Sequence, residues 1–90
     1  MKVLFTKTFI KDFKKLPKSK RDKVRKICLS VFPDIQNLNE LKKKQPKKMK
    51  GYKDYYRIRL GNYRIGFKKR DKEIVFMRVL HRKDIYRHFP

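Results

Sequence analysis

The chain has 90 residues and a formal net charge of +21, from 29 Lys and Arg against 8 Asp and Glu. This length allows one domain, residues 1–90, with a single modest core. The only cysteine, Cys28, excludes an intrachain disulfide, and no apolar run approaches the length of a membrane span. Aromatic residues, at 13% of the chain, and periodic apolar positions favour a folded domain over disorder.

The excess positive charge repels itself and predicts a polyanionic partner. Nucleic acid is the first candidate, because phosphate contacts release counterions and are strongly favourable at low salt. An acidic protein is the second candidate. An anionic membrane surface is the third, since no long basic amphipathic helix stands out. The N-terminal stretch "MKVLFTKTFI" is too short for the apolar part of a signal peptide, so a soluble cytoplasmic protein is expected.

The first segments predict a strand followed by a helix. Residues 2–6 alternate in polarity and include apolar side chains typical of a strand. Thr8 is a reasonable N-cap for a short helix, and Pro17 closes that helix. The apolar positions of the helix are Phe9, Ile10, Phe13 and Leu16.

A second helix is predicted to follow directly. Ser19, with Asp22 three residues later, resembles a capping box, and Phe32-Pro33 is expected to end the helix. Its apolar face consists of Val24, Ile27, Cys28 and Val31. Together the two helices predict a hairpin whose apolar faces cover one side of a sheet.

Residues 33–53 predict less regular structure. Ile35, Leu38 and Leu41 are spaced for a turn or two of helix. The basic stretch that follows, "KKKQPKKMKGYK", is interrupted by a proline and a glycine and is expected to be a loop. Such a loop either stays solvated or contacts phosphate, because long loops in compact domains are usually functional or disordered.

The segment "YYRIRLGNYRIGF", residues 55–67, predicts a hairpin around a Gly61-Asn62 turn. Folding it at that turn pairs Leu60 with Tyr63, Ile58 with Ile65, and Tyr56 with Phe67 on the core face. On the other face the same register places Arg59 opposite Arg64, and Arg57 opposite Gly66. Like charges directly opposite each other destabilise a sheet, so this face needs an explanation.

A last strand, residues 73–81, follows a second turn at residues 70–72. Strict alternation places Val75, Met77 and Val79 in the core, and Phe76, Arg78 and Leu80 on the arginine-bearing face. The resulting β-α-α-β-β-β order predicts an α+β fold. We expect an antiparallel sheet with a two-helix hairpin packed on one face.

The arginine-bearing face has two interpretations. The simpler one is a solvated outer face, as in many half-buried sheets. However, residues 55–67 contain no acidic residue to pair with Arg57, Arg59 or Arg64. Gly66 is expected to leave a hollow beside Arg57, with Tyr55 on the same face. This combination favours a site for a phosphate flanked by unstacked bases.

The segment "VLHRKDIYRHF" supplies further polar groups directly after the last strand: His81, Arg82, Asp84, Tyr86 and His88. Two histidines seven residues apart with one aspartate between them are weak evidence for a metal site, so no metal or other cofactor is expected. The sequence shows no Gly-rich phosphate loop and no Ser or Cys triad. Cys28 lies on an apolar helix face and is expected to be a core residue.

These segments, "KMKGYKDYYRIRLGNYRIGF" and "FMRVLHRKDIY", resemble the RelE/ParE superfamily of bacterial and archaeal toxins. The resemblance covers essentially the whole chain and is sharpest from Met49 to Tyr86. It implies the toxin of a toxin–antitoxin pair. RelE-type members cut messenger RNA in the ribosomal A site, whereas ParE-type members poison DNA gyrase and lack the ribonuclease residues. A cognate antitoxin is implied as a partner, and operator DNA only indirectly through the antitoxin complex.

By position, the resemblance places the ribonuclease site at Arg57, Arg59, Arg64, Arg82 and Tyr86. Further candidates for RNA contacts are Lys48, Lys50, Lys53, Tyr55, Arg78, Lys83, Asp84 and His88. Asp84 and His88 resemble groups that some histidine-containing relatives use. Gyrase poisoning, or a non-enzymatic module that binds nucleic acid or the ribosome, remains the alternative function.

One departure from the family pattern bears on mechanism. Well-studied RelE members carry lysines at the positions of Arg57 and Arg59. Arginine binds phosphate rigidly but stays protonated, so it is a poor general base. For attack of an RNA 2′-hydroxyl on the neighbouring phosphate, Arg64 and Arg82 are therefore expected to stabilise charge, with Arg57 and Arg59 orienting the phosphate.

Tyr86 or His81 is then left for the proton transfers. Surrounding cations favour the phenolate form of a tyrosine. Base stacking is the alternative role for Tyr86.

Overall fold

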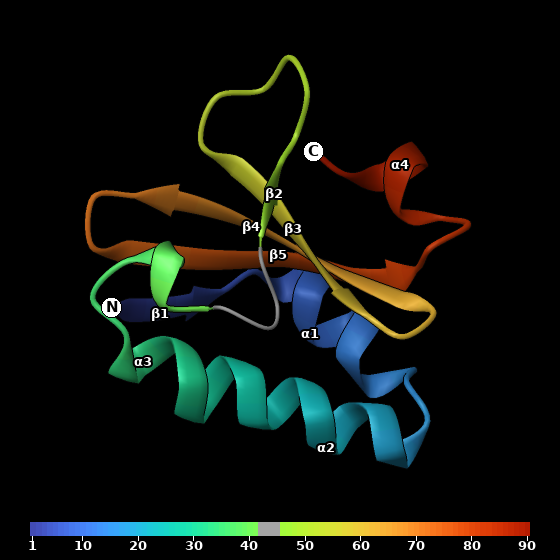
Figure 1. The fold of residues 1–90 in the computed structure, drawn as a ribbon. Coiled ribbons are helices and arrows are strands. Elements are labelled where there is room, and N and C mark those ends of the chain that lie inside the picture. The colour runs from blue at the N-terminus through green and yellow to red at the C-terminus, as the bar shows by residue number, and fades with distance from the viewer. Residues whose placement is uncertain (42–45) are drawn as a thin grey trace.

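The computed structural model describes residues 1–41 and 46–90, in which five strands form one sheet in the order β1-β5-β4-β3-β2 (Figure 1). The strands are β1 Lys2–Phe5, β2 Lys47–Lys48, β3 Tyr55–Leu60, β4 Tyr63–Arg70 and β5 Glu73–His81. The predicted antiparallel meander is confirmed for the last three of them. The sheet as a whole is mixed, because β1 runs parallel to β5 across a long connection. The short β2, which the sequence did not predict, pairs antiparallel with β3.

One face of the sheet is covered by a helical layer (Figure 1). It consists of α1, Lys7–Lys14, and α2, Lys18–Lys26, which continues through a π-helical turn, Ile27–Val31, into α3, Phe32–Asp34. These elements confirm the predicted helical hairpin. The second helix runs one residue past Pro33, because the widened π-helical turn precedes this proline, which has no backbone N–H to donate.

Both predicted helix caps were wrong. The Oγ1 atom of Thr6, not Thr8, caps α1 by accepting the Phe9 N–H at 3.0 Å. Thr6 was assigned to the strand, but its extended backbone is also the conformation of an N-cap residue. The second helix begins directly after Pro17 without a side-chain cap. Ser19 therefore lies inside α2 and does not form a capping box.

The remaining helical elements have one turn each. The helical turn predicted near Leu38 is a single 3-10 turn, Leu38–Glu40, capped by Asn37. The C-terminal helix α4, Ile85–His88, has one turn. Residues 42–45 of the predicted basic loop lie outside the described residues. No helix within residues 1–41 and 46–90 is long and apolar enough to cross a membrane.

The hairpin of β3 and β4 has the register that the sequence predicted. Its core-face pairs are Leu60 with Tyr63, Ile58 with Ile65, and Tyr56 with Phe67, and its outer pairs are Arg59 with Arg64 and Arg57 with Gly66. Gly61 in the turn has a φ of +59°, which glycine adopts without strain. The opposed arginines are therefore a real feature of the folded sheet.

The predicted core side of β5 is confirmed for Val79 but was wrong for Val75 and Met77. Gly66 pairs with Arg78, but Phe67 pairs with Phe76, so Met77 is an extra residue at a β-bulge. The bulge reverses the alternation of side chains, which a strict period of two cannot anticipate. Ile74 and Phe76 are consequently buried in the main core, together with Val79.

A second, smaller cluster of apolar residues lies outside the main core. Its buried members are Met49, Ile85 and Phe89, and the half-buried residues packed against it are Tyr55, Met77 and Leu80. Through Ile85 and Phe89, this cluster fixes α4 against the sheet. The sequence placed Leu80 on this side correctly and Met77 incorrectly.

The second cluster removes the hollow that the sequence predicted at Gly66. A methyl group added at Gly66 would lie 2.7 Å from atoms of the Phe89 ring. The absent side chain of Gly66 therefore makes room for Phe89, and no ligand is needed to fill the space. Phe89 lies near the end of the chain, 23 residues from Gly66, and no local sequence pattern connects the two positions.

This contact gives a testable prediction for Gly66→Ala. The added methyl group overlaps the Phe89 ring, so we expect the free energy of unfolding to fall by about 1–3 kcal/mol. Faster hydrogen exchange of the Phe89 amide, which donates to the Ile85 carbonyl, would show that the C-terminal segment has moved. The same substitution in a Phe89→Ala background should cost much less, and equal costs in both backgrounds would contradict the proposed overlap.

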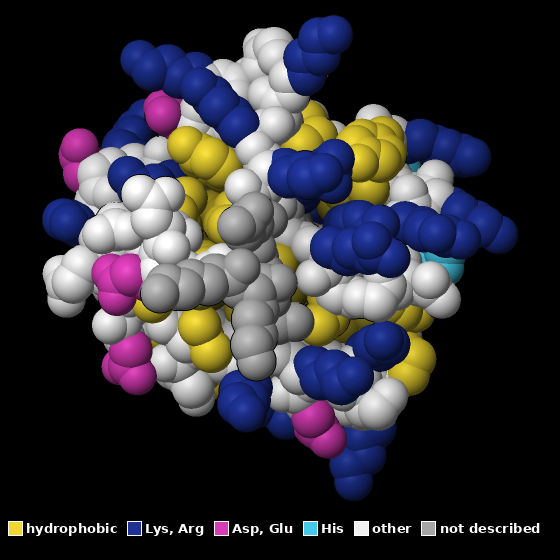
Figure 2. All heavy atoms as spheres, viewed as in Figure 1, with side chains coloured by type: hydrophobic (Ala, Val, Ile, Leu, Met, Phe, Trp, Pro, Cys, Tyr) yellow, Lys and Arg dark blue, Asp and Glu magenta, His cyan; other side chains and the backbone are white. Residues whose placement is uncertain are grey.

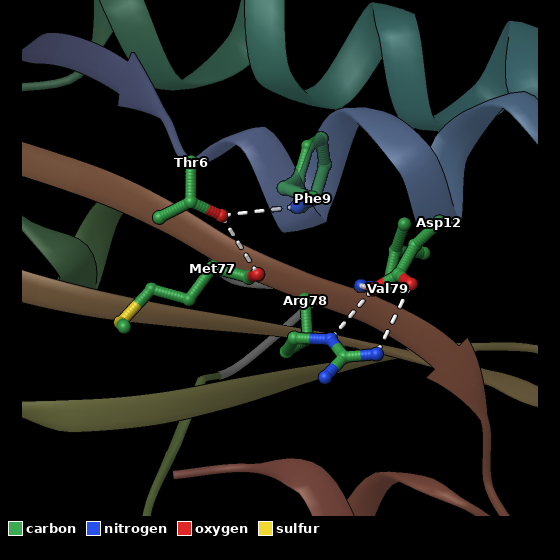
Figure 3. A network of polar contacts seen from close by, with 6 residues as sticks. All are labelled: Thr6, Phe9, Asp12, Met77, Arg78 and Val79. Carbon is green, nitrogen blue, oxygen red and sulfur yellow. Dashed lines mark hydrogen bonds and ion pairs between the residues drawn. The ribbon is translucent and has the colours of Figure 1, made fainter.

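The edge of β5 beyond β1 is closed by residues from the start of the chain (Figure 3). The Thr6 N–H donates to the Phe76 carbonyl at 3.0 Å, and Thr6 Oγ1 donates to the Met77 carbonyl at 3.0 Å. Further along, the Val79 N–H donates to Asp12 Oδ2 at 3.2 Å. These bonds satisfy backbone groups that would otherwise form an open sheet edge.

Asp12 also holds the side chain of Arg78. The Arg78 Nε and Nη2 atoms donate to the two carboxylate oxygens at 2.8 and 3.1 Å (Figure 3). The carboxylate is 7% exposed and the guanidinium side chain 23% exposed. This bidentate pair joins α1 to the last strand. Arg78, which was predicted to contact RNA, is therefore already paired with Asp12.

Candidate active site

Three arginines lie together on the face of β3 and β4 that points away from the helical layer. Arg59 and Arg64 are direct cross-strand partners, and Arg57 is two residues from Arg59 on the same face. The two ion pairs present in residues 1–41 and 46–90 are Arg25–Asp22 and Arg78–Asp12, so neither involves these three arginines. Arg64 is steadied by two carbonyls of the turn, because its Nη1 donates to Gly61 and Tyr63 at 2.9 Å each.

The pKa of Arg64 is shifted by several neighbouring charges. Burial lowers the pKa of Arg64 most, and the neighbouring positive charge of Arg59 lowers it further. Arg57 and Arg82 act in the same direction, whereas the negative charge that Tyr86 carries when ionised raises the pKa of Arg64. The charges of four other predicted catalytic residues thus act on Arg64, although these residues come from β3, the turn after β5, and α4.

Tyr86 is joined to this group by a cation–π contact. The Arg57 guanidinium carbon lies 5.4 Å from the centre of the Tyr86 ring. Tyr86 belongs to α4. The preceding residue of that helix, Ile85, is fully buried, whereas Tyr86 is 58% exposed. Its position is therefore fixed by the second apolar cluster while its ring and hydroxyl remain accessible.

A cleft of about 480 Å³ lies between the loop that joins β2 to β3 and the C-terminal segment. It is lined by Lys48, Met49, Lys50, Tyr52, Arg57, Tyr86, Arg87, Phe89 and Pro90. Figure 2 shows Lys and Arg side chains gathered over the hairpin end and α4, with the visible acidic side chains mostly on the opposite side. The cleft thus combines cations with aromatic surface, as expected for single-stranded nucleic acid.

Five of these lining residues were not predicted as site residues: Met49, Tyr52, Arg87, Phe89 and Pro90. Tyr52 and Arg87 each lie next to a predicted residue or motif, but neither has a distinctive spacing in the sequence. A basic and aromatic composition around Gly51 was the only signal for Tyr52. Lys48 and Lys50, in contrast, were predicted, and the structure places both in the cleft beside Arg57.

His81 does not join the arginines. It pairs with Tyr63, which pairs with Leu60 of the main core, so all three side chains belong to the helix-facing side of the sheet. The His81 and Tyr63 rings meet edge to face at 5.5 Å, and His81 Nδ1 accepts the Lys83 N–H at 3.2 Å. The prediction that His81 shares the catalytic site is therefore not supported by its position.

Other predicted RNA contacts also lie apart from the cleft. Asp84 and His88 line a separate hollow of about 340 Å³ together with Asp12, Arg78 and His81. Tyr55 packs edge to face on Phe89 at 5.8 Å and carries the Lys68 ammonium over its ring at 5.4 Å. Lys53 lies in the loop after β2, outside the cleft lining, and Lys83 is exposed in the turn after β5.

Neither a metal site nor a cysteine nucleophile is apparent in the described part of the chain. Within residues 1–41 and 46–90, no three His, Cys, Asp or Glu side chains are grouped to hold a metal ion. Cys28 is buried in the main core, and burial raises the pKa of its thiol, which keeps it in the unreactive protonated form.

The whole chain matches known toxins in sequence. The family model described as ParE toxin of type II toxin-antitoxin system, parDE, matches residues 3–86. Toxin RelE3 of Methanocaldococcus jannaschii is 51% identical over 90 residues, which are 100% of both chains. The alignment therefore covers both the helical layer and the hairpin.

Solved structures match the same fold. The RelB-RelE antitoxin-toxin complex from Methanococcus jannaschii aligns with a TM-score of 0.81 and 47% identity, over 97% of this chain and 99% of that chain. The RelBE2 toxin-antitoxin complex from Mycobacterium tuberculosis aligns with a TM-score of 0.67 and 25% identity, over 92% of each chain. The chain therefore belongs to the ParE toxin family of type II toxin–antitoxin systems, and within the RelE/ParE superfamily it is a RelE-like toxin.

Proposed function

We propose that this toxin is a metal-independent endoribonuclease that cleaves messenger RNA and thereby inhibits translation. The observation that carries the proposal is the grouping of Arg57, Arg59, Arg64, Arg82 and Tyr86 beside a basic, aromatic cleft. Among residues 1–41 and 46–90, none of the four guanidinium groups forms an ion pair with a carboxylate, so they repel one another in the free protein. A bound phosphodiester would relieve that repulsion. Its negative charge grows in the transition state, and the guanidinium groups would stabilise that growing charge.

The reaction is transfer of the phosphoryl group within the RNA. The 2′-oxygen attacks the neighbouring phosphorus, its proton is removed, and the bond from phosphorus to the 5′-oxygen breaks as that oxygen gains a proton. The products are a 2′,3′-cyclic phosphate and a free 5′-hydroxyl. No water or metal ion takes part in these bond changes.

The geometry supports a division of roles. Arg64, fixed by two turn carbonyls, and Arg82 stabilise the charge on the phosphorane. Arg57 and Arg59 orient the phosphate, because guanidinium groups bind its oxygens in a bidentate manner but do not accept protons at physiological pH. The proton transfers fall to Tyr86, since its side chain contacts Arg57 whereas His81 lies on the other side of the sheet.

We also propose that a RelB-type antitoxin inhibits this toxin. Two relatives of the chain were solved as complexes with RelB-type antitoxins. The basic cleft suits an acidic or amphipathic segment, bound as a helix or an added strand. Binding to operator DNA would then occur only through the complex, whereas the free toxin would act on messenger RNA in the ribosomal A site.

A second candidate is gyrase poisoning, because the matching family model is named for ParE toxins. The two functions predict different first effects in cells. Pulse labelling after induction should show that protein synthesis stops first if the toxin cuts messenger RNA, and that DNA synthesis stops first if it poisons gyrase.

Primer extension on messages from induced cells tests the proposed cleavage directly. We expect new 5′ ends inside reading frames within minutes of induction, at positions in phase with codons if cleavage occurs in the A site. The same messages should stay intact when the antitoxin is co-expressed. Arrested growth with intact messages would overturn the ribonuclease proposal, and binding to ribosomes without cleavage would favour a non-enzymatic module.

A further inference from the structure

Two exposed tyrosines line the cleft from different elements. Tyr52, in the loop between β2 and β3, is 52% exposed, and Tyr86, in α4, is 58% exposed. The other large apolar side chains exposed in residues 1–41 and 46–90, Leu4, Ile10 and Leu29, are aliphatic and do not line this cleft. Within the described residues, the two aromatic side chains that are more than half exposed therefore both line this cleft.

The position of Tyr52 is fixed by its neighbours. Its ring meets Tyr55 edge to face at 6.2 Å, and Tyr55 in turn meets Phe89 at 5.8 Å. The loop itself is closed by two backbone hydrogen bonds, from Tyr52 N–H to the Met49 carbonyl at 3.1 Å and from Met49 N–H to the Tyr55 carbonyl at 2.8 Å. A ring that is already held in place loses little entropy when a ligand binds.

The Tyr86 ring contacts Arg57 on one face and leaves the rest of its surface accessible. The Arg57 guanidinium lies over its ring at 5.4 Å, and more than half of the side chain nevertheless remains exposed. A base stacked on the accessible face would place its own phosphate near the arginine cluster. The surrounding cations Lys48, Lys50 and Arg87 line the same cleft and can pair with the flanking phosphates.

We propose that Tyr52 and Tyr86 hold one unpaired RNA base in this cleft, next to the phosphate that is cleaved. The proposal rests on the ribonuclease function and adds a base-stacking residue, Tyr52, and a requirement for single-stranded substrate. The cleft volume, about 480 Å³, lies within the range of ordinary ligand pockets. Stacking tolerates any base, so this clamp positions the RNA without dictating its sequence.

The clamp can be tested without cleavage. A set of short RNAs with 2′-O-methyl groups at every position cannot be cut, and each carries 2-aminopurine, a fluorescent adenine analogue, at a different place. We expect the wild-type protein to quench the fluorescence at one position when the base stacks. Tyr52→Ala should weaken binding of that RNA by about tenfold, which is about 1.4 kcal/mol, because the base loses one of its two stacking partners. Tyr52→Phe, which keeps the ring, should bind like the wild type.

Two further variants separate the clamp from the chemistry. Tyr86→Phe keeps the ring and loses the hydroxyl, so it should retain quenching and lose cleavage of unmodified RNA. Leu29→Ala removes an exposed apolar side chain from the helical layer and should change neither readout. On cleavable RNA, Tyr52→Ala should raise KM by about tenfold with little change in kcat.

The outcomes distinguish the two proposals. Quenching at no position, or a Tyr52→Ala protein that quenches and binds like the wild type, would overturn the clamp. A Tyr52→Phe protein as weak as Tyr52→Ala would also overturn it, because stacking does not need the hydroxyl. Position-specific quenching by a protein that leaves unmodified RNA intact, even on ribosomes, would overturn the ribonuclease function and support the clamp.

Discussion

Replacing Arg82 with alanine is expected to lower kcat for RNA cleavage by about 10²–10³-fold, the usual effect of removing one donor that stabilises a transition-state charge. Arg82 is exposed in the turn after β5, and its backbone N–H, which donates to the Asn62 carbonyl at 2.7 Å, is kept in the variant. The fold should therefore be unchanged. Single-turnover cleavage of a ribosome-bound message measures the effect, and growth after induction shows its consequence in cells.

Arg70→Ala is the matched control for this experiment. It removes the same charge from an exposed position at the far end of β4, where Arg70 pairs with Glu73. Cleavage by this variant should stay within a few-fold of the wild type, because only long-range attraction to RNA is reduced. Full toxicity of Arg82→Ala at equal expression would remove Arg82 from the catalytic site.

Replacing Asp12 with alanine is expected to lower the free energy of unfolding by about 3 kcal/mol. The substitution leaves the Arg78 guanidinium without its bidentate partner and the Val79 N–H without an acceptor. Arg78 is partly exposed, which limits the cost to less than that of a fully buried charge. Urea unfolding followed by circular dichroism measures the change.

The chain contains its own control for this prediction. Asp22 also pairs with an arginine, Arg25, at 3.3 Å, but both side chains are more than half exposed. Asp22→Ala should change the free energy of unfolding by less than about 0.5 kcal/mol, because water and salt screen an exposed pair. Equal losses from the two aspartate variants would contradict the structural role assigned to Asp12.

The hairpin was predictable because its signals are local. Alternating polarity over residues 55–67 and a two-residue turn at Gly61 are sufficient to set every cross-strand pair. The grouping of Arg57, Arg59 and Arg64 follows directly from that register. The prediction that Arg82 and Tyr86 lie near these arginines relied on the resemblance to a known family, because their position depends on how the end of the chain returns to the sheet.

The features that the sequence did not predict depend on long-range contacts. The bulge at Met77 cannot be recognised from β5 alone, since every residue from 74 to 77 is apolar. The contact of Phe89 with Gly66 joins two distant positions that carry no shared pattern. His81 is different, because it lies two residues after Val79, and simple alternation along β5 would have placed it on the helix-facing side.

The register of the β3–β4 hairpin has a consequence for folding fidelity. If the two strands paired one residue out of step, one of them would turn its arginines toward the main core and expose its apolar side chains. Burying unpaired guanidinium groups costs far more free energy than the repulsion between Arg59 and Arg64 on the surface. The arginines that we propose to bind phosphate therefore also protect the sheet from misaligned pairing while the chain folds.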